Sequence, residues 1–263
     1  MALNWIDVTN LSFNTLLLLE RVQLSWFPGW VHGAELAIAL QANPTIEWYL
    51  RHKCPEIIPW LDHIKSTYRC SSTPPSQQIR QAEIAVMETI SDLLVYVIDP
   101  SIYDAQPFLG WDSNLLLQLT DFSTKIVIDI GSGTGRLAFI AAEIASVVYA
   151  VEPVGNLRQY IKLKAQSMKL TNVYPVDGLI TDLPFPAGFA DITMCGHVFG
   201  DHPEAEHTEM KRVTKQGGMI ILCPGSSQAE SKAHDYLLSQ GFSWSECEEP
   251  VPGLVRKYWK LVA

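Results

Sequence analysis

The hydrophobic pattern of the chain changes near residue 121. Before that point apolar residues recur at helical spacing, and no convincing strand pattern is found. The helices that this spacing predicts cover residues 10–23, 33–41, 44–52, 55–68 and 77–98, followed by a short one that Asp112 or Ser113 opens and that ends at 119. The first part of the chain is therefore predicted to be helical.

After Asp121, short apolar runs alternate with helical stretches. The runs have the length of strands and cover residues 126–130, 147–151, 191–195 and 219–223, and helices are predicted at 137–145 and 156–168. Such alternation is typical of parallel strands with helices on both faces of the sheet. The fold class of this part is therefore α/β.

Two further segments complete the predicted sheet. The weaker run at 173–176 contains Pro175, which cannot donate a ladder hydrogen bond, so this strand is expected at a sheet edge. Residues 242–244 and 256–261 are expected to form a closing β-hairpin around a turn at 250–253.

Composition and charge narrow the class of protein. Hydrophobic residues make up 48% of the 263 positions and charged residues 18%, as in a globular chain of one large or two modest domains. The net charge of −9 disfavours nucleic acid and anionic lipid as partners. There is no apolar stretch of about 18 residues and no signal-peptide pattern. The five cysteines are scattered without a C-x-x-C pair, so a cytoplasmic location is expected.

A glycine-rich turn follows the first predicted strand and opens a helix. Gly131, Gly133 and Gly135 allow the backbone to approach a ligand closely and leave N–H groups exposed at the helix N-terminus. Glu152 ends the next strand about 20 residues further on, where a carboxylate can take both hydroxyls of a ribose. Each feature alone is common, but together and in this order they predict a nucleotide site.

Two residues indicate which nucleotide this is. Arg136 stands where the dinucleotide fingerprint has its third glycine. Asp129, in the strand before the loop, would oppose a pyrophosphate but suits an ammonium or sulfonium group. Both features favour S-adenosylmethionine as the cofactor.

From about residue 121 to 222 the chain resembles the class I S-adenosylmethionine-dependent methyltransferases of the small-molecule type. The matching segments are the glycine loop at 129–135, the acidic strand end at 151–153, the turn at 177–178 and 182–185, the strand opening at 190–191 and ending at 195–197, and the turn at 215–218. The chain departs from the family pattern at Gln216, where proline is usual, and in the turn from Asp177 to Leu183, which is longer than usual.

The resemblance implies a Rossmann-like, seven-stranded, mostly parallel sheet with an antiparallel last strand. We expect residues 1–110 to form an N-terminal helical cap that binds the acceptor, and residues 111–263 to form the domain that binds S-adenosylmethionine. Glu152 is expected to hold the ribose and Asp177 the adenine amino group. The full set of expected cofactor residues is Asp129, Gly131, Ser132, Gly133, Gly135, Glu152, Pro153, Asp177, Gly178 and Gly196, with Tyr103 and Trp111 added by position alone.

His197, just after the fourth strand, is the candidate catalytic residue. A neutral imidazole there could take a proton from an oxygen or nitrogen acceptor. Alternatively it packs against the cofactor or bonds a backbone carbonyl, and the sequence leaves both interpretations open. The spacing of His202, Glu206 and His207 fits a metal site only loosely, so we expect Asp201 to cap a helix there and no metal to bind.

The activity that the resemblance implies is methyl transfer by in-line displacement, without a metal or a covalent enzyme intermediate. Motifs of enzymes that act on DNA bases or protein arginine are absent after the fourth strand, which together with the charge favours a small-molecule acceptor. Two alternatives stay open, a non-catalytic module that binds S-adenosylmethionine and an NAD(P)-dependent oxidoreductase. The oligomeric state is also left open.

Overall fold

A computed structural model describes residues 5–69, 74–110, 112–226, 232–249 and 253–263. The chain divides into two compact units, Met1–Tyr103 and Asp104–Ala263. This division falls slightly before the boundary at 110–111 that we predict from the sequence. Within the described ranges, no helix is both long and apolar enough to cross a membrane.

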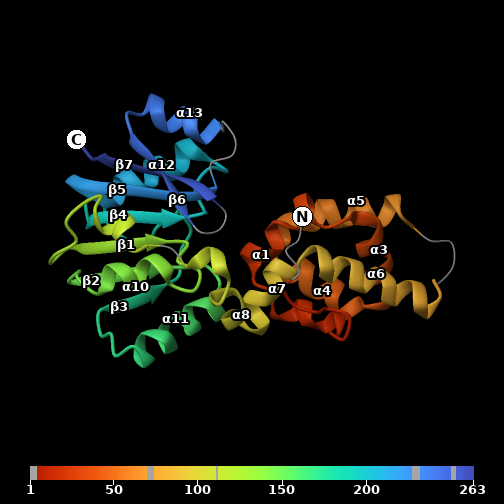
Figure 1. Cartoon of the computed structure of the whole chain (residues 1–263). Coiled ribbons are helices and arrows are strands. Elements are labelled where there is room, and N and C mark those ends of the chain that lie inside the picture. The colour runs from red at the N-terminus through yellow and green to blue at the C-terminus, as the bar shows by residue number, and fades with distance from the viewer. Residues whose placement is uncertain (1–4, 70–73, 111, 227–231, 250–252) are drawn as a thin grey trace. The chain divides into compact units, whose positions relative to one another are not determined.

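The regular elements in the described part of the first unit are all helices (Figure 1). They are the 3-10 helices η1 (Phe13–Leu18) and η2 (Pro55–Ile57) and the α-helices α1 (Arg21–Ser25), α2 (Phe27–Trp30), α3 (Gly33–Ala42), α4 (Pro44–Lys53), α5 (Ile58–Thr67), α6 (Ser76–Thr89) and α7 (Ser91–Ile98). A short helix, α8 (Pro100–Asp104), follows at the unit boundary. The predictions for α3, α4 and α5 are confirmed to within a few residues at each end.

Two helices that the sequence predicts as continuous are interrupted in the structure, so these two predictions are wrong. The one over residues 10–23 is interrupted because Glu20 is extended. The side chain of Glu20 accepts from the backbone N–H of Gln23, and the side chain of Gln23 accepts from the N–H of Glu20, a capping box that starts α1. The one over residues 77–98 is interrupted at Ile90, which leaves helical geometry with φ of −108° and ψ of 19°.

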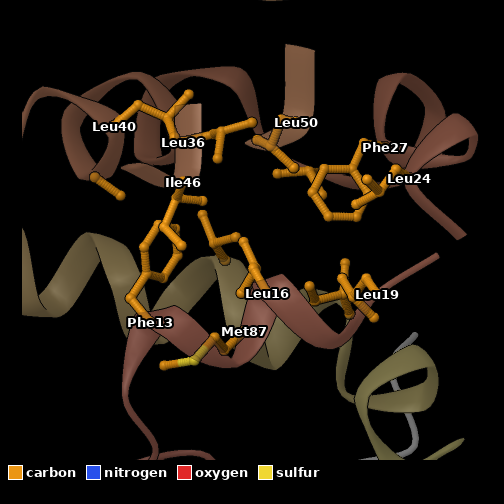
Figure 2. Close-up of a cluster of buried hydrophobic side chains, with 14 of the residues drawn as sticks. Phe13, Leu16, Leu19, Leu24, Phe27, Leu36, Leu40, Ile46, Leu50 and Met87 are labelled. Carbon is orange, nitrogen blue, oxygen red and sulfur yellow. The ribbon is translucent and has the colours of Figure 1, made fainter. Parts of the chain in front are cut away.

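The helical unit has a hydrophobic core of its own (Figure 2). Leu16 of η1, Leu36 and Leu40 of α3, Leu50 of α4 and Met87 of α6 are buried almost completely. Burying an apolar side chain of this size contributes about 1.5–3 kcal/mol. The core therefore joins helices that lie far apart in the sequence.

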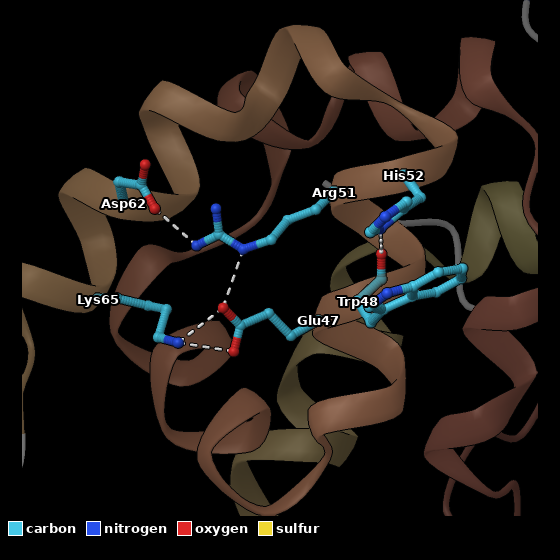
Figure 3. Close-up of polar contacts among 6 residues, drawn as sticks. All are labelled: Glu47, Trp48, Arg51, His52, Asp62 and Lys65. Atoms are coloured by element: carbon cyan, nitrogen blue, oxygen red, sulfur yellow. Dashed lines mark hydrogen bonds and ion pairs between the residues drawn. The ribbon is translucent and has the colours of Figure 1, made fainter.

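A group of charged side chains joins α4 to α5 at the edge of this core (Figure 3). Glu47 accepts hydrogen bonds from Lys65 Nζ at 2.6 and 2.7 Å and from Arg51 Nε at 2.9 Å. Arg51 Nη2 in turn donates to Asp62 at 2.6 Å. The charges of this group are therefore matched by one another, and they fix the two helices together.

The second unit is built on a seven-stranded sheet of order β3-β2-β1-β4-β5-β7-β6. Its strands are β1 (Ile126–Ile130), β2 (Val147–Val151), β3 (Val173–Val176), β4 (Ala190–Gly196), β5 (Thr214–Ser226), β6 (Ser243–Glu249) and β7 (Gly253–Leu261). Neighbouring strands pair in parallel, except that β7 is antiparallel to both β5 and β6. The predicted Rossmann-like, mostly parallel sheet with an antiparallel last strand is confirmed.

The predicted strands are all present, but only the first four have bounds close to the predicted ones. β5, β6 and β7 are longer than predicted, and β5 includes the turn expected at 215–218. β1, β2 and β3 have the predicted bounds, and β3, with Pro175, lies at the sheet edge. The predicted hairpin is formed by β6 and β7, and its turn at 250–252 lies outside the described residues.

Helices cover both faces of this sheet (Figure 1). Leu137 of α10 (Arg136–Ala142) and Ile161 of α11 (Gly155–Ser167) pack on one face, while Met210 of α12 (Pro203–Val213) and Leu237 of α13 (Lys232–Ser239) pack on the other. The short helices η3 (Pro107–Leu109) and α9 (Asn114–Leu117) precede β1. The turns after β1, β2 and β4 meet at the carboxyl edge of the sheet, which is where open α/β sheets bind ligands.

Candidate functional site

The loop between β1 and α10 has a backbone conformation that favours glycine. Gly131, Gly133 and Gly135 have φ angles of 64°, 57° and 91°. A Cβ atom on Gly131 would overlap the side chain of Val198, which follows β4, and one on Gly135 would lie 2.5 Å from the ring of Phe139. The loops after β1 and β4 therefore approach so closely that position 131 has no room for a side chain.

Glu152 lies at the end of β2, and its carboxylate faces the glycine loop. One oxygen, Oε2, accepts a hydrogen bond from the N–H of Gly133 at 2.9 Å, and Oε1 accepts one from the N–H of Val154 at 2.9 Å. The residue is only 5% exposed. Since each carboxylate oxygen has two lone pairs, this fixed acid is suited to accept hydrogen bonds from ribose hydroxyls. The structure thus brings together two predicted cofactor residues from separate turns.

Asp129 is buried beneath the same loop. Its Oδ2 accepts a hydrogen bond from the N–H of Ala138 at 3.0 Å, while Oδ1 has no hydrogen-bond partner among the described residues. Ser132, also a predicted cofactor residue, donates its hydroxyl to the carbonyl of Asp129 at 2.8 Å. Burial raises the pKa of Asp129 to about 7. A positively charged ligand group nearby would favour the ionised carboxylate.

The end of β4 brings Gly196 and His197 to this edge. A Cβ atom on Gly196 would lie 3.5 Å from the guanidinium of Arg136. His197 has a φ of 62°, and its N–H donates to the carbonyl of Cys223 at 3.1 Å. Desolvation, with a contribution from the charge of Arg136, lowers the pKa of His197 to about 4. The imidazole is therefore neutral at pH 7 and able to accept a proton, although so low a pKa makes it a weak base.

Arg158 of α11 connects the ends of β2 and β3, a role that the sequence analysis missed. Its Nη1 donates to the carbonyl of Glu152 at 2.6 Å and to Asp177 at 2.8 Å. The side chain of Asp177 is 73% exposed. Gly178 is enclosed, since a Cβ there would lie 2.9 Å from both Pro184 and Val151. The assignment of Asp177 to the adenine amino group stays a prediction, as do those of Gly178 and Pro153.

Tyr103 and Trp111 also stay predictions. Tyr103 belongs to the helical unit, where its ring packs edge-on against Trp5 at 5.3 Å and Tyr96 at 5.0 Å between centroids. Trp111 lies outside the described residues.

The prediction that Asp201 caps α12 is wrong. The residue at the N-cap is His202, and the capping is done by Glu206, whose carboxylate accepts hydrogen bonds from the N–H groups of His202 and Gly200, both at 2.7 Å. An acid in the first helical turn can reach back in this way because those N–H groups have no partner within the helix. In the part of the chain that the structure describes, no three His, Cys, Asp or Glu residues are grouped to hold a metal ion.

The second unit also contains a cavity that the sequence analysis did not anticipate. It has a volume of about 550 Å³ and lies between the segment that leads to β1 and the outer faces of α10 and α11. Its walls include Asp104, Leu109, Arg136, Ile140, Glu143 and Lys164. These residues come from three separate segments with ordinary helical or loop patterns, so no motif marks them.

The fold and this edge define a class of protein. A seven-stranded sheet with one reversed strand, a glycine loop after β1 and an acid at the end of β2 are the features of the class I methyltransferase fold. A SAM-dependent methyltransferase from Aquifex aeolicus shares the fold, with a TM-score of 0.50 at 16% identity over 63% of this chain and 100% of that chain.

Sequence comparison agrees with this class. Residues 128–222 match the family model described as a methyltransferase domain. The chain is 40% identical over 68 residues to the histone-arginine methyltransferase CARMER of Anopheles gambiae, which is 25% of this chain and 11% of that protein. It is 30% identical over 86 residues to the protein-L-isoaspartate O-methyltransferase of Pelotomaculum thermopropionicum, which is 27% of this chain and 37% of that protein. The chain thus spans a minor part of both relatives.

Residues 128–222 therefore form a methyltransferase domain with the class I methyltransferase fold. The residues at the sheet edge fit S-adenosylmethionine as its cofactor. Asp129 has a buried acceptor atom without a partner, which suits a positively charged group, and the carboxylate of Glu152 suits ribose hydroxyls.

Proposed function

We propose that the protein transfers the methyl group of S-adenosylmethionine to a small-molecule acceptor by in-line displacement. The observation that carries the proposal is the arrangement of two acids around one glycine loop. Glu152 is bonded to the N–H of Gly133, and Asp129 lies buried beneath the same loop. The matched methyltransferase domain, over residues 128–222, supports it.

Each acid has a separate role in holding the cofactor. Asp129 balances the positive charge of the cofactor's amino-acid end, and Glu152 binds the ribose hydroxyls. Asp177 reads the adenine amino group, for which its bond to Arg158 has to open or be shared. S-adenosylmethionine, when bound, supplies a methyl group that is activated by the neighbouring sulfonium.

The chain's contribution to the reaction is mainly to position the acceptor. Holding two reactants in line converts a bimolecular step into a nearly unimolecular one. His197 is neutral at pH 7 because desolvation lowers its pKa to about 4. It accepts a hydrogen bond, or at most a weakly held proton, from the acceptor.

The proposal of a small-molecule acceptor rests on the net charge of the chain and on how little of the chain the two relatives match. The net charge of −9 disfavours polyanions. The two relatives are named for protein substrates, but they match only 25% and 27% of this chain. A substrate class need not follow so short a match, since the same cofactor-binding fold hosts many acceptors.

Turnover of methyl-labelled S-adenosylmethionine tests the proposal. The full chain is incubated with a panel of small metabolites and, separately, with protein and peptide acceptors. Label in a small-molecule product is expected. Label only in protein acceptors would overturn the acceptor class, and tight binding without any turnover would instead favour the non-catalytic module.

His197→Ala tests the role of the histidine separately. We expect slower turnover with little change in cofactor affinity, because the side chain is assigned to the acceptor. An unchanged rate on a true acceptor would show that His197 only packs against the bound molecules.

A further inference from the structure

We propose that the cavity beside α10 is the acceptor pocket, and that it takes an elongated, largely apolar molecule with an acidic oxygen group at the end next to Arg136. The acidic group is a carboxylate or a phenol. This inference rests on the proposed methyl transfer, and it adds where the acceptor binds and which atom is methylated.

The outer face of α10 forms one wall of this cavity. Arg136, Phe139, Ile140 and Glu143 line it, which is the i, i+3, i+4, i+7 spacing of one helix face. At 1.5 Å per residue this face extends about 10 Å along the helix axis. The volume of about 550 Å³ is within the range of pockets that bury a small organic molecule. The wall is therefore long enough for an elongated ligand.

The wall of the cavity carries one matched pair of charges. Lys164 Nζ donates to both oxygens of Asp104, at 2.6 and 2.7 Å, and the hydroxyl of Tyr160 donates to Asp104 at 2.8 Å. The ammonium also lies 5.1 Å from the ring centroid of Phe139. Because this acid and base satisfy each other, the apolar side chains of Phe139 and Ile140, which lie between Arg136 and Glu143 on the face of α10, favour an apolar ligand body.

The two ends of the α10 wall differ in charge. Glu143 is exposed at one end of this wall and disfavours an anion there. Arg136 lies at the other end, where its guanidinium is 3.5 Å from the position of a Cβ on Gly196. Arg136 thus belongs both to the cavity and to the edge where the loops after β1 and β4 meet. An anionic oxygen held by Arg136 would lie at the edge where the cofactor is proposed to bind.

An acceptor oxygen at that end can take the methyl group in one displacement step. A lone pair of the acceptor oxygen forms the new O–CH₃ bond as the bond from the methyl carbon to sulfur breaks, and sulfur keeps that electron pair. A carboxylate attacks without losing a proton, whereas a phenol first gives its proton to solvent or to His197. The products are a methyl ester or ether and the neutral thioether.

A pair of fluorescent probes tests the pocket without a known acceptor. The probes are 1-anilinonaphthalene-8-sulfonate, which is acidic, and N-phenyl-1-naphthylamine, which has the same rings without the acid. We expect the full chain to bind the acidic probe saturably and about tenfold more tightly than the neutral one, as one charge-assisted contact would give. Equal affinity for the two probes, or no saturable binding, would overturn the acidic preference or the pocket.

Three variants locate the binding. Ile140→Trp fills the cavity and is expected to weaken both probes more than about tenfold. Met168→Trp, on the α11 wall, gives the same test should the first variant fold poorly. Arg136→Gln is expected to weaken the acidic probe alone. Leu163→Trp is the matched control, because Leu163 is an exposed residue of α11 outside the cavity. An equal loss in this control would overturn the assignment.

A second arm tests the acceptor role. Release of S-adenosylhomocysteine is measured with arylalkanoic acids and phenols and with the corresponding primary amides and methyl ethers. Turnover of acidic compounds only, lost in Ile140→Trp with the cofactor affinity unchanged, is expected. Turnover that persists in Ile140→Trp, or acids that bind without turnover, would overturn it. Absence of S-adenosylmethionine binding would instead refute the proposed function, and the probes would still report on the cavity.

Discussion

The two compact units differ in the number of polar side chains that they bury. In the described part of the helical unit the buried polar side chains are Gln23 and Ser91. Gln23 has a structural role, since its amide donates to the carbonyl of Leu93 at 3.0 Å and accepts from the N–H of Glu20 at 3.1 Å. The second unit buries many more: Asp129, Ser132, Thr134, Glu152, Thr193, Glu206, His207, Thr214 and Lys257.

Several of these groups lie in or under the turns at the carboxyl edge of the sheet. Asp129, Ser132 and Thr134 belong to the glycine loop and the strand before it, and Glu152 bonds to that loop. A buried polar atom without a partner is destabilising, and folds that need only stability remove or pair such groups. The comparison indicates that this edge is built for a ligand, whereas the hydrogen bonds of Gln23 support the structure of the helical unit. That residues 1–110 bind the acceptor stays a prediction.

The largest effect is expected from a methyl group on the glycine loop. Gly131→Ala places a Cβ where Val198 lies, at a φ of 64°. We expect S-adenosylmethionine affinity to fall about 100-fold or more, because strain and displacement of the β4 loop act together. Gly188→Ala is the control, since Gly188 has a φ of 62° with nothing within 4 Å of the added carbon. Equal losses in the two variants would mean that backbone strain alone is responsible.

A substitution in the hydrophobic core of the helical unit tests the other half of the comparison. Leu40→Ala removes a side chain that is 1% exposed, and should cost about 2–5 kcal/mol of unfolding free energy. Cofactor affinity should change less than about twofold, since the site lies in the other unit. Denaturant unfolding and calorimetry measure the two quantities. A large loss of affinity would show that the helical core supports the cofactor site.

Acid should destabilise the second unit through His207. Desolvation lowers its pKa from 6.5 to about 4, and its Nε2 has no partner among the described residues. Between these pH values the unfolded chain binds a proton that the folded one does not, so stability falls as pH drops from 6.5 to 4. The contribution is roughly 3 kcal/mol.

The test compares the free energy of unfolding of the wild type with that of His207→Gln. Denaturant unfolding measures both across that pH range. Asp129 acts in the opposite sense, since its raised pKa of about 7 lets the folded chain bind a proton first. Asp129 is present in both proteins, so its contribution cancels in the difference between their free energies of unfolding. The exposed His63→Gln serves as control, and the same slope in wild type and His207→Gln would contradict the assignment.

The smallest effect is expected in the charged group of the helical unit. Glu47→Gln leaves Lys65 and Arg51 without the acid that both contact, and we expect a loss of about 1–2 kcal/mol in unfolding free energy. High salt should reduce the difference, because these charges are partly exposed. Glu88→Gln, at an exposed position of α6, is the control. No change in Glu47→Gln would show that the group contributes nothing measurable.

The sheet could be predicted from the sequence because its signals are local. Apolar runs bounded by Gly, Pro or Asp gave the bounds of β1, β2 and β3, and Pro175 placed β3 at the edge. The glycine loop and Glu152 could be predicted for the same reason, since a strand, a turn and a helix start follow one another along the chain.

The remaining features depend on contacts that sequence spacing does not show. The break at Ile90 interrupts a continuous helical pattern, as tertiary packing often overrides propensity. Glu206 caps α12 from within the helix, although Asp201 stands at the more usual distance. The bonds from Arg158 to Glu152 and Asp177, and the cavity beside α10, join segments that only the fold brings together.

Calorimetric titration of S-adenosylhomocysteine into the wild type and Glu152→Gln tests the central claim most directly. The account predicts one site per chain in the wild type and a loss of about tenfold or more in the variant, because a charged acceptor for the ribose hydroxyls is removed. Glu204→Gln, an exposed acid of α12, should bind like the wild type. No heat with this compound while NADH binds, or equal affinity in wild type and Glu152→Gln, would contradict the account.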